Sequence, residues 1–262
     1  MRDGELTPGV TMDIHQKITL AKLLEQMRVD VIEVGYPGAF KKDFDQIFMV
    51  SKQIKQSIIC GLASSKLDEV MDVALAIKPA AKGRIHVYTS VNLNQLDLTE
   101  QTLEAIRNSV SLARNYCADV EWSAFDAPRS KPDFVCQAVE TAIQSGATTI
   151  NIPDSLGWSS PAKFSSLLKM LFNRVPNIEQ ATISVHCHND LGLAVKNSLA
   201  ALKCGARQIE CSINGLGMRK GNADLKEVVM AIIKSRRYQV DIETSLLDAA
   251  AELVEQITQQ PA

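Results

Sequence analysis

Two histidines one residue apart are the strongest candidates for chemistry in this sequence. The stretch TISVHCHND (residues 182–190) places His186 and His188 among β-branched and apolar residues. Successive side chains of a strand point to opposite faces, so both imidazoles would share one face and Cys187 would take the other. Two imidazoles held together repel when both are protonated, whereas neutral ones suit a shared metal ion. The spacing indicates either a metal site or two independently hydrogen-bonded residues at a strand end.

A carboxylate and an amide could complete the ligand set of such a metal. Asp3 lies beside Arg2 in the opening stretch MRDGELTPG, and Asn222 lies in the glycine-rich stretch GLGMRKGNADL. Oxygen ligands of this kind join imidazoles around divalent ions such as Mg²⁺, Mn²⁺ and Zn²⁺. The guanidinium of Arg2 could hold a substrate carboxylate or neutralise a developing enolate. Taken alone, each stretch has a plainer explanation, a frayed terminus for the first and a helix N-cap by Asn222 for the second.

The elements that would position these residues alternate regularly along the chain. Seven short β-branched runs are separated by amphipathic segments with apolar residues at helical spacing, and Gly146 and Gly205 mark helix ends. The runs are VDVIEVGY, SIICGLA, RIHVYTS, DVEWSAFDA, TTINIPDS, TISVHCHND and QIECSINGLG. This alternation predicts a parallel sheet covered by helices.

The number of elements favours an α/β fold of the (β/α)8 TIM-barrel type, with most of the first strand missing from the chain start. The chain opens with a predicted helix over residues 13–28, so a strand would be expected before it. No GxGxxG motif follows a predicted strand, which argues against a dinucleotide-binding doubly wound sheet. We expect a catalytic barrel over residues 1–240, a C-terminal helical extension over residues 241–262 and no regulatory domain.

In such barrels the chemistry lies at the carboxyl ends of the strands. Polar residues collect at these positions in the sequence, namely Glu33, Ser64, His86, Ser123, Asp154, Ser155, His186, His188 and Asn214. The histidine pair therefore stands at the expected end of its strand, which favours the metal site over the plainer explanation.

The composition narrows the classes of partner. The 262 residues carry a formal net charge of −2, which gives no electrostatic reason to expect nucleic acid or an anionic membrane. No uninterrupted apolar run reaches the length of about 18 residues that a membrane span needs, and no signal peptide is evident. The six cysteines form no CxxC pair and lie in apolar segments, as reduced thiols do in a cytoplasmic protein.

Four stretches together resemble the 2-isopropylmalate synthase and homocitrate synthase family, part of the DRE-TIM metallolyase superfamily. They match it in order and spacing, and they are RDGELTPGV, NIPDSLGW, HCHNDLGLAVKNSLAAL and QIECSINGLGMRKGNADLKEVV. The resemblance implies a divalent metal, acetyl-CoA as co-substrate, a 2-oxo acid as acceptor and a homodimer. It also implies that Asp3, His186 and His188 hold the metal, with Asn222 close by.

The same resemblance implies roles for further residues. Arg2 would polarise the keto oxygen of the 2-oxo acid, with Glu33 paired to its guanidinium. His86, Ser123 and Ser155 would line the oxo-acid pocket. The implied reaction is a Claisen condensation, in which acetyl-CoA loses a methyl proton and the enolate attacks a metal-polarised carbonyl carbon.

The sequence departs from the family pattern at several pocket positions. Leu6 and Ser64 stand where the family usually has glutamine and arginine, and Phe125 and Met218 stand where it has glutamate. Phe125 and Leu6 would suit a more apolar 2-oxo acid, whereas Met218 cannot exchange a proton. Three functions stay open: a synthase, a lyase or aldolase of the same superfamily, and a non-catalytic or truncated relative that binds metal or 2-oxo acid.

Overall fold

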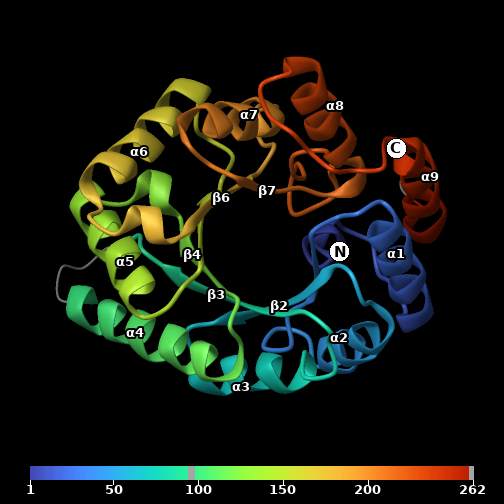
Figure 1. The fold of residues 1–262 in the computed structure, drawn as a ribbon, viewed down its shortest axis with the longest axis horizontal. Helices are drawn as coiled ribbons and strands as arrows, with labels where there is room; N and C mark the ends of the chain where they lie inside the picture. The colour runs from blue at the N-terminus through green and yellow to red at the C-terminus, as the bar shows by residue number, and fades with distance from the viewer. Residues whose placement is uncertain (94–97, 260–262) are drawn as a thin grey trace.

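Seven parallel strands form one sheet that curves into an open barrel. Each strand is hydrogen-bonded to the next in chain order, and the strands trace an arc inside a ring of helices (Figure 1). The computed structural model describes residues 1–93 and 98–259. The strands are β1 (Val31–Gly35), β2 (Ile58–Ser64), β3 (Gly83–Ser90), β4 (Val120–Phe125), β5 (Thr149–Asp154), β6 (Thr182–Cys187) and β7 (Gln208–Glu210). The predicted TIM-barrel type of fold, with seven strands in the chain, is confirmed.

Helices α1 to α8 cover the outside of the sheet, and α9 packs beside α1, so the two ends of the described chain meet (Figure 1). Their bounds are α1 (Ile14–Gln26), α2 (Lys42–Gln53), α3 (Leu67–Ala76), α4 (Thr99–Tyr116), α5 (Pro132–Gln144), α6 (Pro161–Arg174), α7 (Ala194–Cys204), α8 (Leu225–Ser235) and α9 (Leu247–Thr258). Within the described ranges, no helix has both the length and the apolar character needed to cross a membrane.

Local sequence signals account for several helix boundaries. Asp13 caps α1 by accepting a hydrogen bond from the Gln16 amide, and the Gln16 side chain accepts one from the Asp13 amide in return. Helices α5 and α6 each begin with proline, whose missing N–H costs nothing in the first turn. Gly205, with φ of +117°, ends α7 in the left-handed region that glycine adopts without strain. The predicted helix end at this glycine is confirmed.

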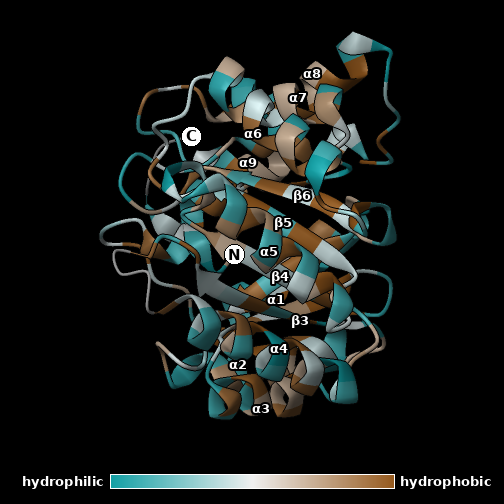
Figure 2. Ribbon diagram, turned by 90° about the vertical axis from the view of Figure 1, so that its left-hand side faces the viewer, coloured by the Kyte–Doolittle hydropathy of each residue, from teal (hydrophilic) through white to brown (hydrophobic). Residues whose placement is uncertain are grey.

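The apolar core lies between the strands and the helices, whereas the inside of the barrel is polar. Ile85 and Trp122 point outward and are fully buried in the core. Their neighbours Arg84, His86 and Glu121 point inward, because side chains alternate along a strand. Figure 2 shows the hydrophobic strands enclosed by helices whose outer surfaces are mostly hydrophilic. Functional side chains can therefore occupy the barrel interior without disturbing the core.

A cavity of about 860 Å³ separates the two edge strands, β1 and β7, and Ile32 and Ile209 are among its lining residues. At the carboxyl end of β1, the Arg2 amide donates a hydrogen bond to the Glu33 carbonyl at 3.0 Å. A neighbouring parallel strand would make the same kind of bond. Arg2 therefore lies beside the carboxyl end of β1, where a preceding parallel strand would end.

The last strand and the C-terminal region differ in detail from the predicted elements. The run QIECSINGLG was predicted as one strand, but β7 ends at Glu210 and a 3-10 turn, η5 (Ile213–Gly215), follows. Asn214 within η5 has φ of +56°, which no strand residue adopts. The expected extension contains a short turn, η6 (Thr244–Leu246), and α9, while its residues 260–262 lie outside the described residues.

Candidate metal centre

The structure brings the predicted metal ligands together at the carboxyl end of β6. Ligand atoms of Asp3, His186 and His188 all lie within 4.8 Å of one another. His186 Nε2 is 3.3 Å from Asp3 Oδ2 and 3.0 Å from Asn222 Oδ1. Bonds of about 2.0–2.2 Å around one divalent ion place its ligand atoms at most about 4.4 Å apart. A small movement of these side chains would therefore bring them into that range, and the nitrogen and oxygen donors fit such an ion.

A sharp loop after η5 delivers Asn222 to the histidines. His188 follows the last residue of β6 and forms an isolated bridge with Asn222. The loop closes through a hydrogen bond from the Asn222 amide to the Gly215 carbonyl, at 2.8 Å. Gly221 has φ of +85°, and a Cβ built on it would lie 2.1 Å from the Gly215 oxygen. Only glycine fits this position, so the glycine-rich stretch serves the geometry of the loop.

The two imidazoles have opposite electrostatic environments. Burial lowers the pKa of His186, but hydrogen bonds to Asp3 and Glu210 and their charges outweigh burial and raise this pKa to about 10. Burial and then the charge of His186 lower the pKa of His188 to about 4. Burial raises the pKa of Asp3, but Arg2 and His186 reverse the effect and hold it well below its usual range. Metal binding would displace a proton from His186, because metal ligands must be deprotonated.

A chain of hydrogen bonds connects the metal ligands to the predicted oxo-acid pocket. Arg2 lies 3.3 Å from Asp3 and donates from Nε to Glu33 Oε2 at 2.8 Å. Glu33 Oε1 lies 2.8 Å from His86 Nδ1, and His86 Nε2 lies 2.7 Å from the Ser123 hydroxyl. Each side chain is oriented by the next, which is the preorganisation that a binding site for a charged substrate requires.

Burial lowers the pKa of His86, but Glu121 and Glu33 outweigh burial and raise it to about 8. Burial raises the pKa of Glu33, whereas Arg2 and His86 hold it well below its usual range. The imidazole therefore carries a proton at neutral pH and the carboxyl group does not. A protonated His86 donates to the Glu33 carboxylate and to the Ser123 hydroxyl, whose own O–H is left to donate to an anionic substrate.

Two predicted pocket residues lie at the same end of the barrel: Phe125 is the last residue of β4, and Ser155 follows β5. The Ser155 hydroxyl accepts a hydrogen bond from the Asp126 amide at 2.9 Å. Its carbonyl accepts one from Arg219 at 2.8 Å. The Phe125 ring is 44% exposed, and its centroid lies 6.1 Å from that of Tyr88. Ser155 therefore joins two loops, and Phe125 offers an apolar surface at the mouth of the barrel.

Sequence reasoning did not assign the charged residues deeper in the barrel. Arg84 donates to Glu121 and to Gln208, each at 2.8 Å, and Glu210 Oε2 lies 2.7 Å from His186 Nδ1. Gln208 and Glu210 are two residues apart in the run QIE, as the two histidines are in HCH. This alternation was the signal that could have placed Gln208 and Glu210 on the inner face.

Two further groups of ligand atoms lie within metal-binding distance of one another in the described part of the chain. One comprises Glu33, Cys60 and His86, and the other comprises His86, Glu121 and Glu210. Both share His86, whose two ring nitrogens already contact Glu33 and Ser123. The centre at Asp3, His186 and His188 is therefore the best candidate, since Asn222 adds a fourth donor there.

The fold and the site define a class of protein, an α/β barrel with a candidate divalent-metal centre at the carboxyl ends of its strands. Residues 1–254 match the HMGL-like family, and the chain belongs to this family.

Curated relatives extend the similarity. The chain is 46% identical over 269 aligned positions to a 2-isopropylmalate synthase of Rhodopseudomonas palustris, covering all of this chain and 51% of that protein. It is also 46% identical to a 2-isopropylmalate synthase of Dechloromonas aromatica, covering all of this chain and 52% of that protein. The chain thus spans about half the length of these relatives.

The solved structure of a hydroxymethylglutaryl-CoA lyase from Pseudomonas aeruginosa superposes with a TM-score of 0.79. It is 17% identical, and the match covers 99% of this chain and 91% of that one. At this identity the likeness establishes the shared barrel fold.

Proposed function

We propose that the chain is the catalytic barrel of a metal-dependent acyltransferase that condenses acetyl-CoA with a 2-oxo acid, as a 2-isopropylmalate synthase does. The observation that carries this proposal is the convergence of Asp3, His186, His188 and Asn222 next to the guanidinium of Arg2. A metal and a fixed cation side by side suit a substrate with adjacent keto and carboxylate oxygens. The relatives named 2-isopropylmalate synthase support the same reaction.

The protein side chains would bind and orient the reactants. A bound divalent ion would supply Lewis-acid polarisation of the keto oxygen. Arg2, held by Glu33 and Asp3, would direct its remaining N–H groups at the oxygen that gains negative charge during attack. Ser123, held by His86, would donate to the acid's carboxylate, and Phe125 would contact its apolar side chain.

The donor set suits Mg²⁺, Mn²⁺ and Zn²⁺, because imidazole, carboxylate and amide ligands serve all three. The six cysteines are free thiols, which supports a reducing compartment such as the cytoplasm. We also propose that the protein is a homodimer without membrane or nucleic-acid partners. The division into a barrel (1–240) and an extension (241–262) belongs to the same proposal.

A second candidate is a relative that binds metal and 2-oxo acid without turnover. Phe125 and Met218 favour it, because both are partly exposed at positions where the family pattern has a carboxylate. A pocket without these carboxylates would lack two groups able to move a proton.

The deciding experiment measures thiol release from acetyl-CoA by the purified chain with Mn²⁺ or Mg²⁺. The acceptors are pyruvate, 2-oxoisovalerate, 2-oxoglutarate and an aromatic 2-oxo acid, and His188→Ala is the control variant. We expect turnover with an apolar acid and its loss in His188→Ala. Metal binding that depends on His188, without thiol release from any acceptor, would refute the acyltransferase and support the binding relative.

A further inference from the structure

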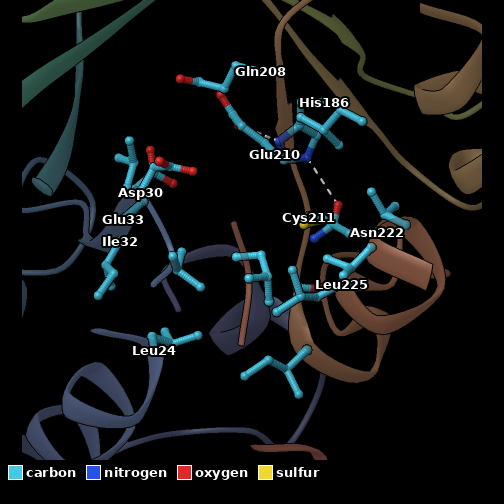
Figure 3. A pocket seen from close by; sticks show the side chains of 18 of the residues that line it. Leu24, Asp30, Ile32, Glu33, His186, Gln208, Glu210, Cys211, Asn222 and Leu225 are labelled. Carbon is cyan, nitrogen blue, oxygen red and sulfur yellow. Dashed lines mark hydrogen bonds and ion pairs between the residues drawn. The ribbon is translucent and has the colours of Figure 1, made fainter. Parts of the chain in front are cut away.

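Glu210 stands behind the metal-facing side of His186. It is the last residue of β7, and it pairs in register with His186 on the neighbouring strand β6. The carboxylate contacts Nδ1 at 2.7 Å, while Asn222 and Asp3 lie on the Nε2 side of the ring. Figure 3 shows the imidazole between Glu210 and Asn222, with a contact to each. The two ring nitrogens therefore have chemically different partners.

We propose that Glu210 is a positioning residue that keeps a proton on His186 Nδ1 and reserves Nε2 for the metal ion. The inference rests on the proposed metal-dependent function. An ionised carboxylate can only accept hydrogen bonds, so the nitrogen facing it must be the donor. The lone pair of a neutral ring then lies on Nε2, on the side of Asp3 and Asn222. A carboxylate behind a histidine ligand also makes the imidazole a stronger base toward the metal.

Glu210 lies inside the barrel with Arg84, Glu121 and Gln208, which together form a layer of charged and polar side chains. Gln208 points to the same side of β7 and donates to Glu121 at 2.8 Å and to the Ser184 hydroxyl at 2.9 Å. Arg84 donates to Glu121 and Gln208 from the other side of the barrel. These bonds tie β7 to β3, β4 and β6 although one edge of β7 faces the cavity. The position of Glu210 therefore depends on cross-barrel contacts.

The neighbouring carboxyl group of Glu121 limits the repulsion within this layer. Burial first, and the charge of Glu210 second, raise the pKa of Glu121 above its usual value. Burial raises the pKa of Glu210, but its hydrogen bond to His186 and the charges of His86 and His186 lower it below its usual value. The 2.7 Å contact with His186 Nδ1 thus places the Glu210 carboxylate against the imidazole.

The test compares Glu210→Ala and Glu210→Gln with the wild-type chain by calorimetric titration with Zn²⁺. A hydrogen-bond partner of a metal-binding histidine is worth about 10–100-fold in metal affinity, so we expect a loss in that range for Glu210→Ala. Glu210→Gln retains an acceptor oxygen and should lose less. Glu69→Gln is the matched control, since Glu69 is also buried but bonds to Tyr36 and Ser64 rather than to the layer that holds Glu210. It should change the Zn²⁺ affinity by less than about threefold, below the range expected for a hydrogen-bond partner of a metal ligand.

A second measurement does not require metal. Nitrogen-15 NMR of the metal-free chain should show a slowly exchanging Nδ1–H on His186 that is retained in Glu69→Gln and lost in Glu210→Ala. Equal Zn²⁺ affinity and an unchanged Nδ1–H in Glu210→Ala would overturn the inference, and so would a wild-type chain that binds no Zn²⁺. Tight His186-dependent binding without thiol release would instead refute the acyltransferase and leave the positioning role supported.

Discussion

Replacing Lys17 by methionine should destabilise the chain far more than any exposed lysine substitution. The Lys17 side chain is fully buried, and its ammonium lies 2.5 Å from Glu5 Oε2 and 3.7 Å from Asp43 Oδ1. It also donates to the Val34 carbonyl at 2.9 Å. Glu5 belongs to η1 (Asp3–Leu6), the turn that begins with a candidate metal ligand. Lys17 thus connects α1 and β1 to the segment that carries Asp3.

The size of the effect follows from the charges that remain. Lys17→Met keeps the aliphatic stem but leaves two carboxylates buried without their cation, and such a loss costs about 3–5 kcal/mol. Glu5 keeps hydrogen bonds from the Met12 amide and Lys42, whereas Asp43 Oδ1 has no hydrogen-bond partner in the described structure. We therefore expect about 3 kcal/mol, near the lower end of the range.

Urea unfolding followed by circular dichroism measures this change, with Lys42→Met as the matched control. Lys42 also pairs with Glu5, at 3.1 Å, but its side chain is 48% exposed. An exposed pair is worth about 0–1 kcal/mol, so the control should be nearly neutral. Zn²⁺ affinity should fall in Lys17→Met and stay unchanged in the control. Similar unfolding free energies for the two variants would refute the role given to the buried ammonium.

The pH dependence of the unfolding free energy should reveal the same Lys17–Glu5 interaction. Burial raises the pKa of Glu5, but Lys17 reverses this effect, and the folded-state pKa lies below the ordinary value of 4.5. A carboxyl group with a depressed folded pKa stabilises the fold above its unfolded pKa and loses that contribution as pH falls through its folded pKa. The unfolding free energy of the wild type should therefore decline below about pH 4.5. The decline should be shallower in Lys17→Met, and equal slopes would contradict the assignment.

Two further changes test the loop and the pocket mouth. Gly221→Ala forces a Cβ against the Gly215 carbonyl at a left-handed position, so it should lower the unfolding free energy by at least about 1 kcal/mol and weaken Zn²⁺ binding. The control is Gly192→Ala, because Gly192 also has a positive φ but a Cβ there would meet nothing within 4 Å. Equal Zn²⁺ affinities of the two variants would contradict the role given to Gly221. Phe125→Glu should leave the unfolding free energy within about 0.5 kcal/mol, because the ring is partly exposed. It should lower kcat/KM for 2-oxoisovalerate about tenfold relative to pyruvate; an unchanged ratio would show that Phe125 does not contact the side chain of the acid.

The strands, the helices and the ligand types could be read from the sequence because the signals are local. Alternation of apolar runs and helical segments located the seven strands, but several predicted runs were too long: β6 ends at Cys187, before His188, and β7 ends at Glu210. The period-2 spacing of His186 and His188 placed both imidazoles together, and their ring centroids lie 4.9 Å apart. The pairing of Arg2 with Glu33 followed from the family resemblance, and the structure contains it at 2.8 Å.

The partners inside the barrel were decided by the tertiary structure alone. Asn222 and Asp3 are 219 residues apart and Arg84 and Gln208 are 124 apart, yet each pair is hydrogen-bonded across the barrel. Which strands face each other depends on the curvature and register of the whole sheet, and no local period encodes these. The opposite pKa shifts of His186 and His188 have the same origin, because burial and the charges of Asp3 and Glu210 act through space. The sequence by itself determined which groups could bind a metal, and the arrangement of distant strands around the open barrel decided that His186 Nε2 lies beside Asp3 and Asn222.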